Sequence, residues 1–144
     1  MRFTELGSGE FMLRLEKREA ILLSLKRFAK SKNLEAAVFE GIGSLNEVKL
    51  GHYDFTRKSY RYEVFREELE ILTLSGNISI LDKLPLPHAH VTLGRRDFSV
   101  IGGHLDEGSS ANMVEIVLRA MRGKLVKVKD EEVGLNLLRL PKKL

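Results

Sequence analysis

The sequence contains no cysteine, tryptophan or glutamine, and it has only three prolines among its 144 residues. Without cysteine the chain forms no disulfide bond, and a transition metal would need histidine or carboxylate ligands. The sequence also lacks an uninterrupted apolar run of the length that a transmembrane helix requires, because charged residues break every hydrophobic stretch. The first residues, Met1 to Glu5, lack the apolar core of a secretion signal. We therefore expect a cytoplasmic protein.

The length and the charge pattern indicate one globular domain. We expect it to span residues 1–144, with a core at about 8–140. Hydrophobic residues make up 43% of the chain, which excludes disorder over most of its length. The net charge is +4, but lysines and arginines are scattered among glutamates, whereas a nucleic-acid-binding protein usually concentrates them. Charged residues reach 31%, which is typical of the surface of a thermophile's protein.

The spacing of apolar residues predicts many strands and one helix. Ile21, Leu25 and Phe28 recur at helical intervals and predict a helix over residues 16–30. The two prolines after Leu81 predict a loop. Strands are predicted at 11–15, 35–40, 48–54, 60–64, 68–79, 88–93, 99–105, 113–118, 125–128 and 135–140. Because strands and helices do not alternate, we expect an α+β fold with a mainly antiparallel or mixed sheet and one substantial helix packed on it.

Three of the four histidines lie in one predicted hairpin. His88 and His90 are two residues apart, so their rings project from the same face of a strand. If the hairpin loop has an odd number of residues centred near Asp97, His104 lies opposite His90 on that face, and a slip of one residue would reverse it. Three neutral imidazoles on one face would form a zinc site with one open coordination position. Half-buried histidines that hydrogen-bond to the backbone would give the same spacing.

A glycine-rich segment follows the strand predicted at 35–40. Gly41 and Gly43 flank one apolar residue and precede Ser44, a pattern that permits unusual backbone angles or close backbone approach. The segment lacks the Gly-Lys-Ser/Thr sequence of a phosphate-binding loop. We interpret it as a tight bend beside the histidines or beside a neighbouring subunit. Gly103, which precedes His104, is a further position where backbone shape matters.

Three glutamates interrupt apolar strands and are candidates for a supporting role. Glu40, Glu70 and Glu115 each need a hydrogen-bond or ion-pair partner, or a place at an interface, if their strands are buried. Glu70 faces the core if Leu72 and Leu74 do. If a metal is bound nearby, one of these carboxylates is a candidate general base.

The order of these motifs resembles the plant and prokaryote conserved (PPC) domain. The resemblance covers about residues 8–140 of the chain. In plants this domain follows DNA-binding AT-hooks in nuclear-localised proteins, and many prokaryotic members consist of the domain alone. The matching motifs are Glu40–Ser44, Leu69–Ile78, His88–Val91, Gly102–Leu105 and Glu115 in its apolar strand.

The resemblance implies an α/β fold in which a helix packs on a mainly antiparallel sheet. It also implies a homotrimer, with a metal such as zinc at the matching residues His88, His90 and His104 near a subunit interface. Prokaryotic members are often labelled as DNA-binding because of their plant relatives. An AT-hook needs an Arg-Gly-Arg-Pro core to enter the minor groove, and this chain has none.

Two functions follow, and the sequence does not decide whether the protein is an enzyme. The first is a homotrimeric interaction module, DNA-associated or regulatory, with a histidine-based zinc site. The second is a zinc-dependent enzyme or a small-molecule-binding protein, in which a metal-bound water would attack a substrate. A third role for the histidines is a metal staple that only stabilises the assembly.

Overall fold

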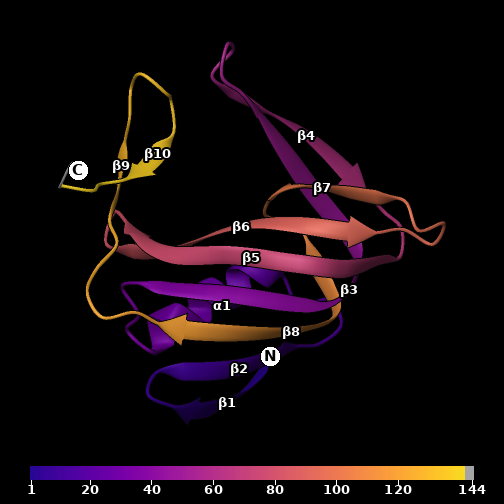
Figure 1. The fold of residues 1–144 in the computed structure, drawn as a ribbon, viewed down its shortest axis with the longest axis horizontal. Coiled ribbons are helices and arrows are strands. Elements are labelled where there is room, and N and C mark those ends of the chain that lie inside the picture. Colours follow the sequence, from indigo (N-terminus) through magenta and orange to yellow (C-terminus); the bar gives the residue numbers. More distant parts are fainter. Residues whose placement is uncertain (142–144) are drawn as a thin grey trace.

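The computed structural model describes residues 1–141, so the last three residues of the predicted domain lie outside the described range. Figure 1 shows a broad, curved sheet with the helix behind it. The elements are β1 (Arg2–Gly7), β2 (Glu10–Leu15), α1 (Ile21–Ser31), β3 (Ala37–Asp54), β4 (Ser59–Phe65), β5 (Leu69–Leu81), β6 (Leu84–Gly94), β7 (Val100–Leu105), β8 (Ser110–Ala120), β9 (Lys127–Lys129) and β10 (Asn136–Leu138).

Eight strands form one sheet whose strand pairs are antiparallel, in agreement with the mainly antiparallel or mixed sheet expected from the sequence. Their order is β1-β2-β8-β3-β5-β6-β7, and β4 pairs with β3 beside this path. The first half of β3 lies between β8 and β5, whereas its second half pairs with β4 and, at Leu50 and Gly51, with β7. Strands β3, β5, β6 and β7 therefore close into a ring of pairings. Among residues 1–141, the one parallel contact is an isolated bridge between Ile80 and Val126.

The helix is shorter than predicted. It begins at Ile21 and spans 11 residues, so it is a small helix and not the substantial one expected. Arg18 has a left-handed backbone, with φ at 70°, which prevents the helix from starting earlier. The predicted apolar stripe is confirmed, because Leu25, Phe28 and Ala29 are buried. In the described part of the chain, no helix has the length and hydrophobicity needed to cross a lipid bilayer.

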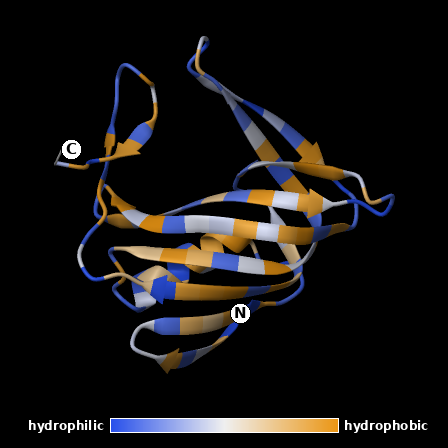
Figure 2. Cartoon of the chain, viewed as in Figure 1, coloured by the Kyte–Doolittle hydropathy of each residue, from blue (hydrophilic) through white to orange (hydrophobic). Residues whose placement is uncertain are grey.

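The core lies between α1 and the inner face of the sheet. Figure 2 shows hydrophobic and hydrophilic residues alternating along the central strands, the pattern of a sheet with one buried face. Burying one such side chain contributes about 1.5–3 kcal/mol. The largest fully buried side chains are Leu13, Leu15, Ile21, Leu25, Leu45, Leu69, Leu74, Ile78, Leu93, Leu105, Ile116 and Leu118.

The loop predicted around the two prolines is instead a two-residue hairpin turn between β5 and β6. Asp82 and Lys83 have positive φ angles of 48° and 67°, as in a type I′ turn. Pro85 and Pro87 lie inside β6. They fit because β7 pairs with β6 only from His90 onward, so the first half of β6 is an edge. The N–H that each proline lacks would point away from β5, where no ladder bond is lost.

A bulge in β5 changes which of its residues face the core. The register with β6 shifts between Ile71 and Thr73. Ile71 and Leu74 are therefore buried, while Glu70 and Leu72 are exposed. The prediction that Leu72 shares a face with Leu74 is wrong, because the bulge adds one residue that simple alternation does not reveal.

The last two strands do not complete the main sheet as predicted. β9 and β10 pair only with each other, in a separate two-stranded sheet. A backbone hydrogen bond of 2.7 Å from the Ile80 N–H to the Leu125 carbonyl ties this C-terminal hairpin to the end of β5. Figure 1 shows this C-terminal hairpin above the turn that joins β5 to β6.

Candidate metal centre and adjoining cavity

Three histidine side chains converge where β6 and β7 pair. His90 and His104 are directly opposite each other, and His88 lies two residues earlier on β6. The hairpin is centred on Asp97, which is the condition under which the sequence placed His104 opposite His90. The ring centroids are 5.3 Å apart for His88 and His90, 5.1 Å for His88 and His104, and 5.5 Å for His90 and His104. One potential ligand nitrogen from each ring lies within 4.8 Å of the others.

This donor set fits a zinc ion. Nitrogens bound to one tetrahedral zinc lie about 3.4 Å apart, a spacing that small ring rotations would reach. The Nδ1 atom of His104 is buried and has no hydrogen-bond partner among residues 1–141. A buried polar atom without a partner is uncommon, and an ion held by the cluster would supply the partner that this atom lacks. Three histidines also leave a fourth zinc position for water or a ligand.

Burial keeps two of the imidazoles neutral. The pKa of His88 is lowered to about 4, chiefly by burial and then by the positive charge of Lys127. Burial also lowers the pKa of His104, and His90 adds to this effect while Asp106 opposes it. A metal binds the neutral form of imidazole. At neutral pH these two rings can therefore accept a metal without first losing a proton.

An aromatic ladder packs against the histidine cluster from the hairpin of β3 and β4. The Tyr60 ring lies 4.9 Å from the His104 ring. Tyr62 stacks on Tyr60 at 5.3 Å, and Tyr53 meets it edge-on at 5.0 Å. Burial raises the pKa of Tyr60, so its phenol stays protonated. The ladder fixes the His104 ring by packing.

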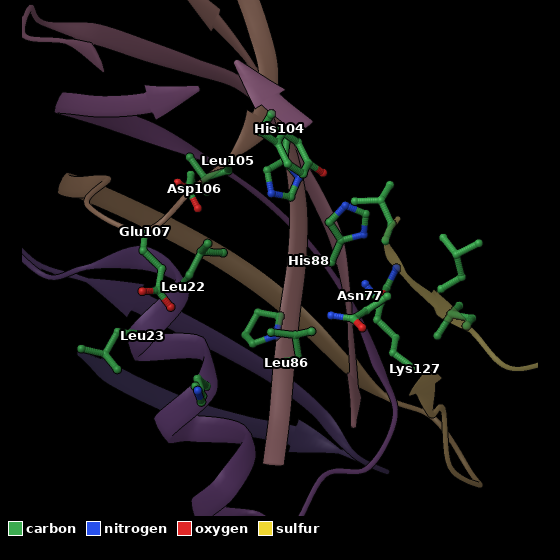
Figure 3. Close-up of a pocket in the computed structure, with 17 residues that line it drawn as sticks. Leu22, Leu23, Asn77, Leu86, His88, His104, Leu105, Asp106, Glu107 and Lys127 are labelled. Carbon is green, nitrogen blue, oxygen red and sulfur yellow. The ribbon is translucent and has the colours of Figure 1, made fainter. Parts of the chain in front are cut away.

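A cavity of about 590 Å³ adjoins the cluster, and His88 and His104 form part of its wall. Figure 3 shows α1 on one side of β6, with Asn77 and Lys127 together near His88 on the other. A volume of this size is typical of small-molecule sites. The full lining is Leu22, Leu23, Lys26, Tyr60, Asn77, Leu86, Pro87, His88, His104, Leu105, Asp106, Glu107, Lys127 and Leu135–Leu138.

Comparison with known proteins identifies the family. The sequence matches the family model of the Plants and Prokaryotes Conserved (PCC) domain over residues 4–122. The chain belongs to this family. Its members are also called PPC proteins, the name used below. No curated protein matches the sequence significantly.

Solved structures of similar proteins share the fold over nearly the whole chain. A PPC protein from Pyrococcus horikoshii is 34% identical, with 99% of this chain and 97% of that chain covered and a TM-score of 0.88. A metal-containing protein from Archaeoglobus fulgidus is 34% identical, with 97% and 99% covered and a TM-score of 0.87. A candidate DNA-binding protein from Bacteroides thetaiotaomicron is 27% identical, with 98% of both chains covered and a TM-score of 0.91.

Gly103 brings β7 close to β3 in this PPC domain. Gly51 of β3 pairs with His104. A Cβ atom at Gly103 would lie 3.0 Å from the Gly51 carbonyl oxygen. The absence of a side chain therefore lets β7 cross β3 closely and seats His104 against the aromatic ladder.

The glycine-rich segment forms a bulge inside one continuous strand, β3, of the PPC sheet. It is not a bend between two strands. The register of β3 with β5 shifts between Gly41 and Gly43. Gly43 has a φ of +140°, and a Cβ there would lie 2.2 Å from the Met113 carbonyl oxygen. Only glycine fits such a position without moving the backbone of β8. Ser44 follows the bulge and pairs with Met113.

The three candidate glutamates are all exposed, and none of them lines the cavity beside the histidines. Glu40 and Glu115 border a shallow hollow on the outer face of the sheet, together with Ile42 and Leu72. Glu70 precedes the bulge of β5 on the same strand as Leu72. The structure therefore brings the histidines together but keeps these carboxylates out of the cavity.

Sequence reasoning missed two polar residues of the cavity. Asn77 pairs with His88 across β5 and β6. Lys127 comes from the C-terminal hairpin, beyond the segment that matches the family. The available signal was a single lysine inside the apolar stretch Leu125–Val128. Its position depended on where the hairpin packs, and alternation alone does not give that.

Proposed function

We propose that this PPC domain is a homotrimeric regulatory module that binds zinc and presents the metal to a small-molecule ligand. His88, His90 and His104 would hold the ion. The observation that carries the proposal is the convergence of three imidazoles, two of them lining a cavity of about 590 Å³. The 34% identical relative from Archaeoglobus fulgidus, described as a metal-containing protein, supports it.

Metal analysis of the protein purified without a histidine tag tests the zinc site. We expect one zinc per chain after exposure to zinc and removal of the excess. His104→Ala should abolish stoichiometric binding, because two imidazoles alone are a poor zinc site. His52→Ala is the matched control, since His52 is exposed and lies outside the cluster. Wild-type protein that takes up no zinc at neutral pH would contradict the proposal.

Exposed apolar side chains on the outer face of the sheet support the homotrimer. Ile42 is 61% exposed, Leu72 is 50% exposed and Met113 is 51% exposed. A patch of this kind on a globular domain is typical of an interaction surface. We place the contact between copies on this face, with Glu40 and Glu115 as its polar members.

The geometry supports ligand binding better than catalysis. In many zinc-dependent hydrolases a carboxylate within hydrogen-bond reach of the metal-bound water acts as the general base. Glu40, Glu70 and Glu115 are outside the cavity. Asp106 lines the cavity but forms an ion pair of 2.6 Å with Lys49. A zinc-dependent enzyme is therefore the alternative, with Glu107 as the remaining carboxylate in the lining.

DNA association is a second candidate function. The net charge of +4 and the relatives from Bacteroides thetaiotaomicron and Ralstonia eutropha, described as candidate DNA-binding proteins, favour it. Many surface cations are already paired with glutamates, for example Arg119 with Glu10 and Glu40. A gel-shift titration at rising salt concentration tests this function, because binding through phosphates must weaken steeply. No shift at low salt would exclude it.

A further inference from the structure

We propose that the cavity beside the metal centre binds the carboxylate of a small organic acid, with Lys127 and Asn77 as its polar contacts next to the metal. This inference rests on the metal centre proposed above and adds the chemical class of its ligand.

Lys127 is the first observation. It is half-buried and lines the cavity together with His88. Among residues 1–141, no carboxylate oxygen lies within 4.0 Å of the Lys127 Nζ atom, the distance limit of an ion pair. Burial alone lowers the pKa of Lys127. Withdrawing an ammonium group from water is costly unless an anion pairs with it. A cation that borders a cavity and has no internal partner indicates an anionic ligand.

Asn77 is an independent polar contact. Its Oδ1 atom is buried and has no hydrogen-bond partner among residues 1–141. Because Asn77 pairs with His88 across the strands, its side chain stands beside that ring, as Figure 3 shows. Its amide supplies N–H donors for a carboxylate oxygen and a free acceptor for a neighbouring hydroxyl.

The rest of the cavity favours an organic acid over an inorganic anion. The lining contains two carboxylates, Asp106 and Glu107, and Asp106 is already paired with Lys49. Its other polar residues, besides the histidines, Asn77 and Lys127, are Lys26, Tyr60 and Asn136. The two lysines of the lining, Lys26 and Lys127, are point charges, and the lining has no arginine whose fork would favour phosphate. Much of the wall is apolar and can enclose a hydrocarbon body. These apolar side chains are Leu22, Leu23, Leu86, Pro87, Leu105, Leu135, Leu137 and Leu138.

The origin of these residues divides the site into two parts. The histidines lie within residues 4–122, which match the family, whereas Lys127 lies beyond them. The metal ligands therefore belong to the matched domain, and the cation that selects the ligand belongs to the C-terminal hairpin.

Calorimetric titration of the zinc-loaded protein tests the inference. The probe is 3-methylbutanoate, and the matched neutral compound is 3-methylbutanamide. We expect the carboxylate to bind at least about tenfold more tightly than the amide. A short peptide with a free C-terminal carboxylate, run in parallel, separates a chain terminus from a small acid. Tighter binding of the peptide would overturn the assignment to a small acid.

Variants locate the contact. Lys127→Met should weaken 3-methylbutanoate binding about tenfold and leave the zinc content unchanged. Lys127→Arg, which keeps the charge, should retain most of the affinity and shows that the hairpin still folds. Lys17→Met is the matched control, because Lys17 is exposed, outside the cavity and undergoes the same change of charge. The visible spectrum of the cobalt-substituted protein should change when 3-methylbutanoate is added, which gives a second readout.

The two proposals fail in different ways. Zinc-loaded wild type that binds no carboxylate, or Lys127→Met that binds as tightly as Lys17→Met, overturns the ligand class and leaves the metal centre standing. A chain that takes up neither zinc nor cobalt contradicts the metal centre and the ligand class together.

Discussion

His90 on β6 and His104 on β7 face each other across the ladder, with ring centroids 5.5 Å apart. Paired residues of antiparallel strands project from the same face, so this one pairing fixes both rings relative to each other. His88 joins them because it lies two residues before His90 on the same strand. The backbone register therefore organises the cluster before any metal binds.

The pH dependence of the metal-free protein follows from the buried ring of His88. Its pKa is about 4 in the folded chain, compared with 6.5 for an exposed histidine. As the pH falls, the unfolded chain binds this proton first, so stability present above pH 6.5 is lost as the pH drops toward 4. Because the ring is only half-buried, solvent screening leaves an effect on the order of 1 kcal/mol.

Urea unfolding at several pH values, compared with His88→Gln, measures this contribution. The free energy of unfolding of the wild type, relative to that of the variant, should fall as the pH drops from 6.5 toward 4. An identical pH dependence in both proteins would contradict the assignment to His88.

Gly43→Ala should destabilise the fold by more than about 2 kcal/mol, because the new methyl group would meet the backbone of β8 in addition to the strain of positive φ. The measurement is the free energy of unfolding in urea. Gly123→Ala is the matched control, since Gly123 also has a positive φ, of +100°, but an added Cβ would meet nothing within 4 Å. Equal losses in both variants would show that the close approach to β8 does not matter.

Leu72→Glu should dissociate the proposed trimer without unfolding the chain. The side chain is 50% exposed in the single chain, so a charge is tolerated there until a second copy covers it. Analytical ultracentrifugation should give three times 16.4 kDa for wild type and 16.4 kDa for the variant. Phe98→Glu, at a residue that is 91% exposed on the turn between β6 and β7, should leave the mass unchanged. A monomeric wild type would refute the trimer.

Tyr60→Leu should weaken zinc binding by about two- to tenfold, because His104 loses the ring that packs against it. Tyr60→Phe keeps the ring and should bind zinc like wild type. Phe55→Leu removes a ring at the far end of the hairpin of β3 and β4, where Phe55 is 70% exposed and packs on Tyr53, and it should leave zinc binding unchanged. Competition with a chromogenic chelator gives the affinities. Equal zinc affinity in Tyr60→Leu and wild type would mean that the ladder does not support the site.

Local periodicity was enough to predict the mainly antiparallel sheet and the existence of the histidine hairpin, but it left the register of that hairpin open. The pairing of His90 with His104 required a loop centred on Asp97, which the structure supplies, because side chains alternate strictly when no bulge intervenes. The same rule failed in β5, where the bulge before Thr73 put Leu72 on the exposed side. Alternation predicts the face of a residue only where each residue of one strand pairs with one residue of the next, and a bulge breaks this one-to-one pairing.

Long-range packing explains what the sequence did not predict. Lys127 reaches the histidines because the C-terminal hairpin packs on the end of β5, and no local pattern encodes that contact. The turn at Asp82 and Lys83 was hidden by the prolines that follow it, which usually interrupt strands but are tolerated at an edge. The position of each misjudged residue depends on a neighbour that is distant in sequence.

Pro85 and Pro87 have a consequence for the behaviour of the protein at high concentration. The uncovered half of β6 presents carbonyl oxygens but lacks amide donors at these two positions. A strand from another molecule therefore cannot form along this edge the continuous ladder of backbone hydrogen bonds that a fibril needs. The mouth of the cavity can therefore stay uncovered without becoming a seed for aggregation.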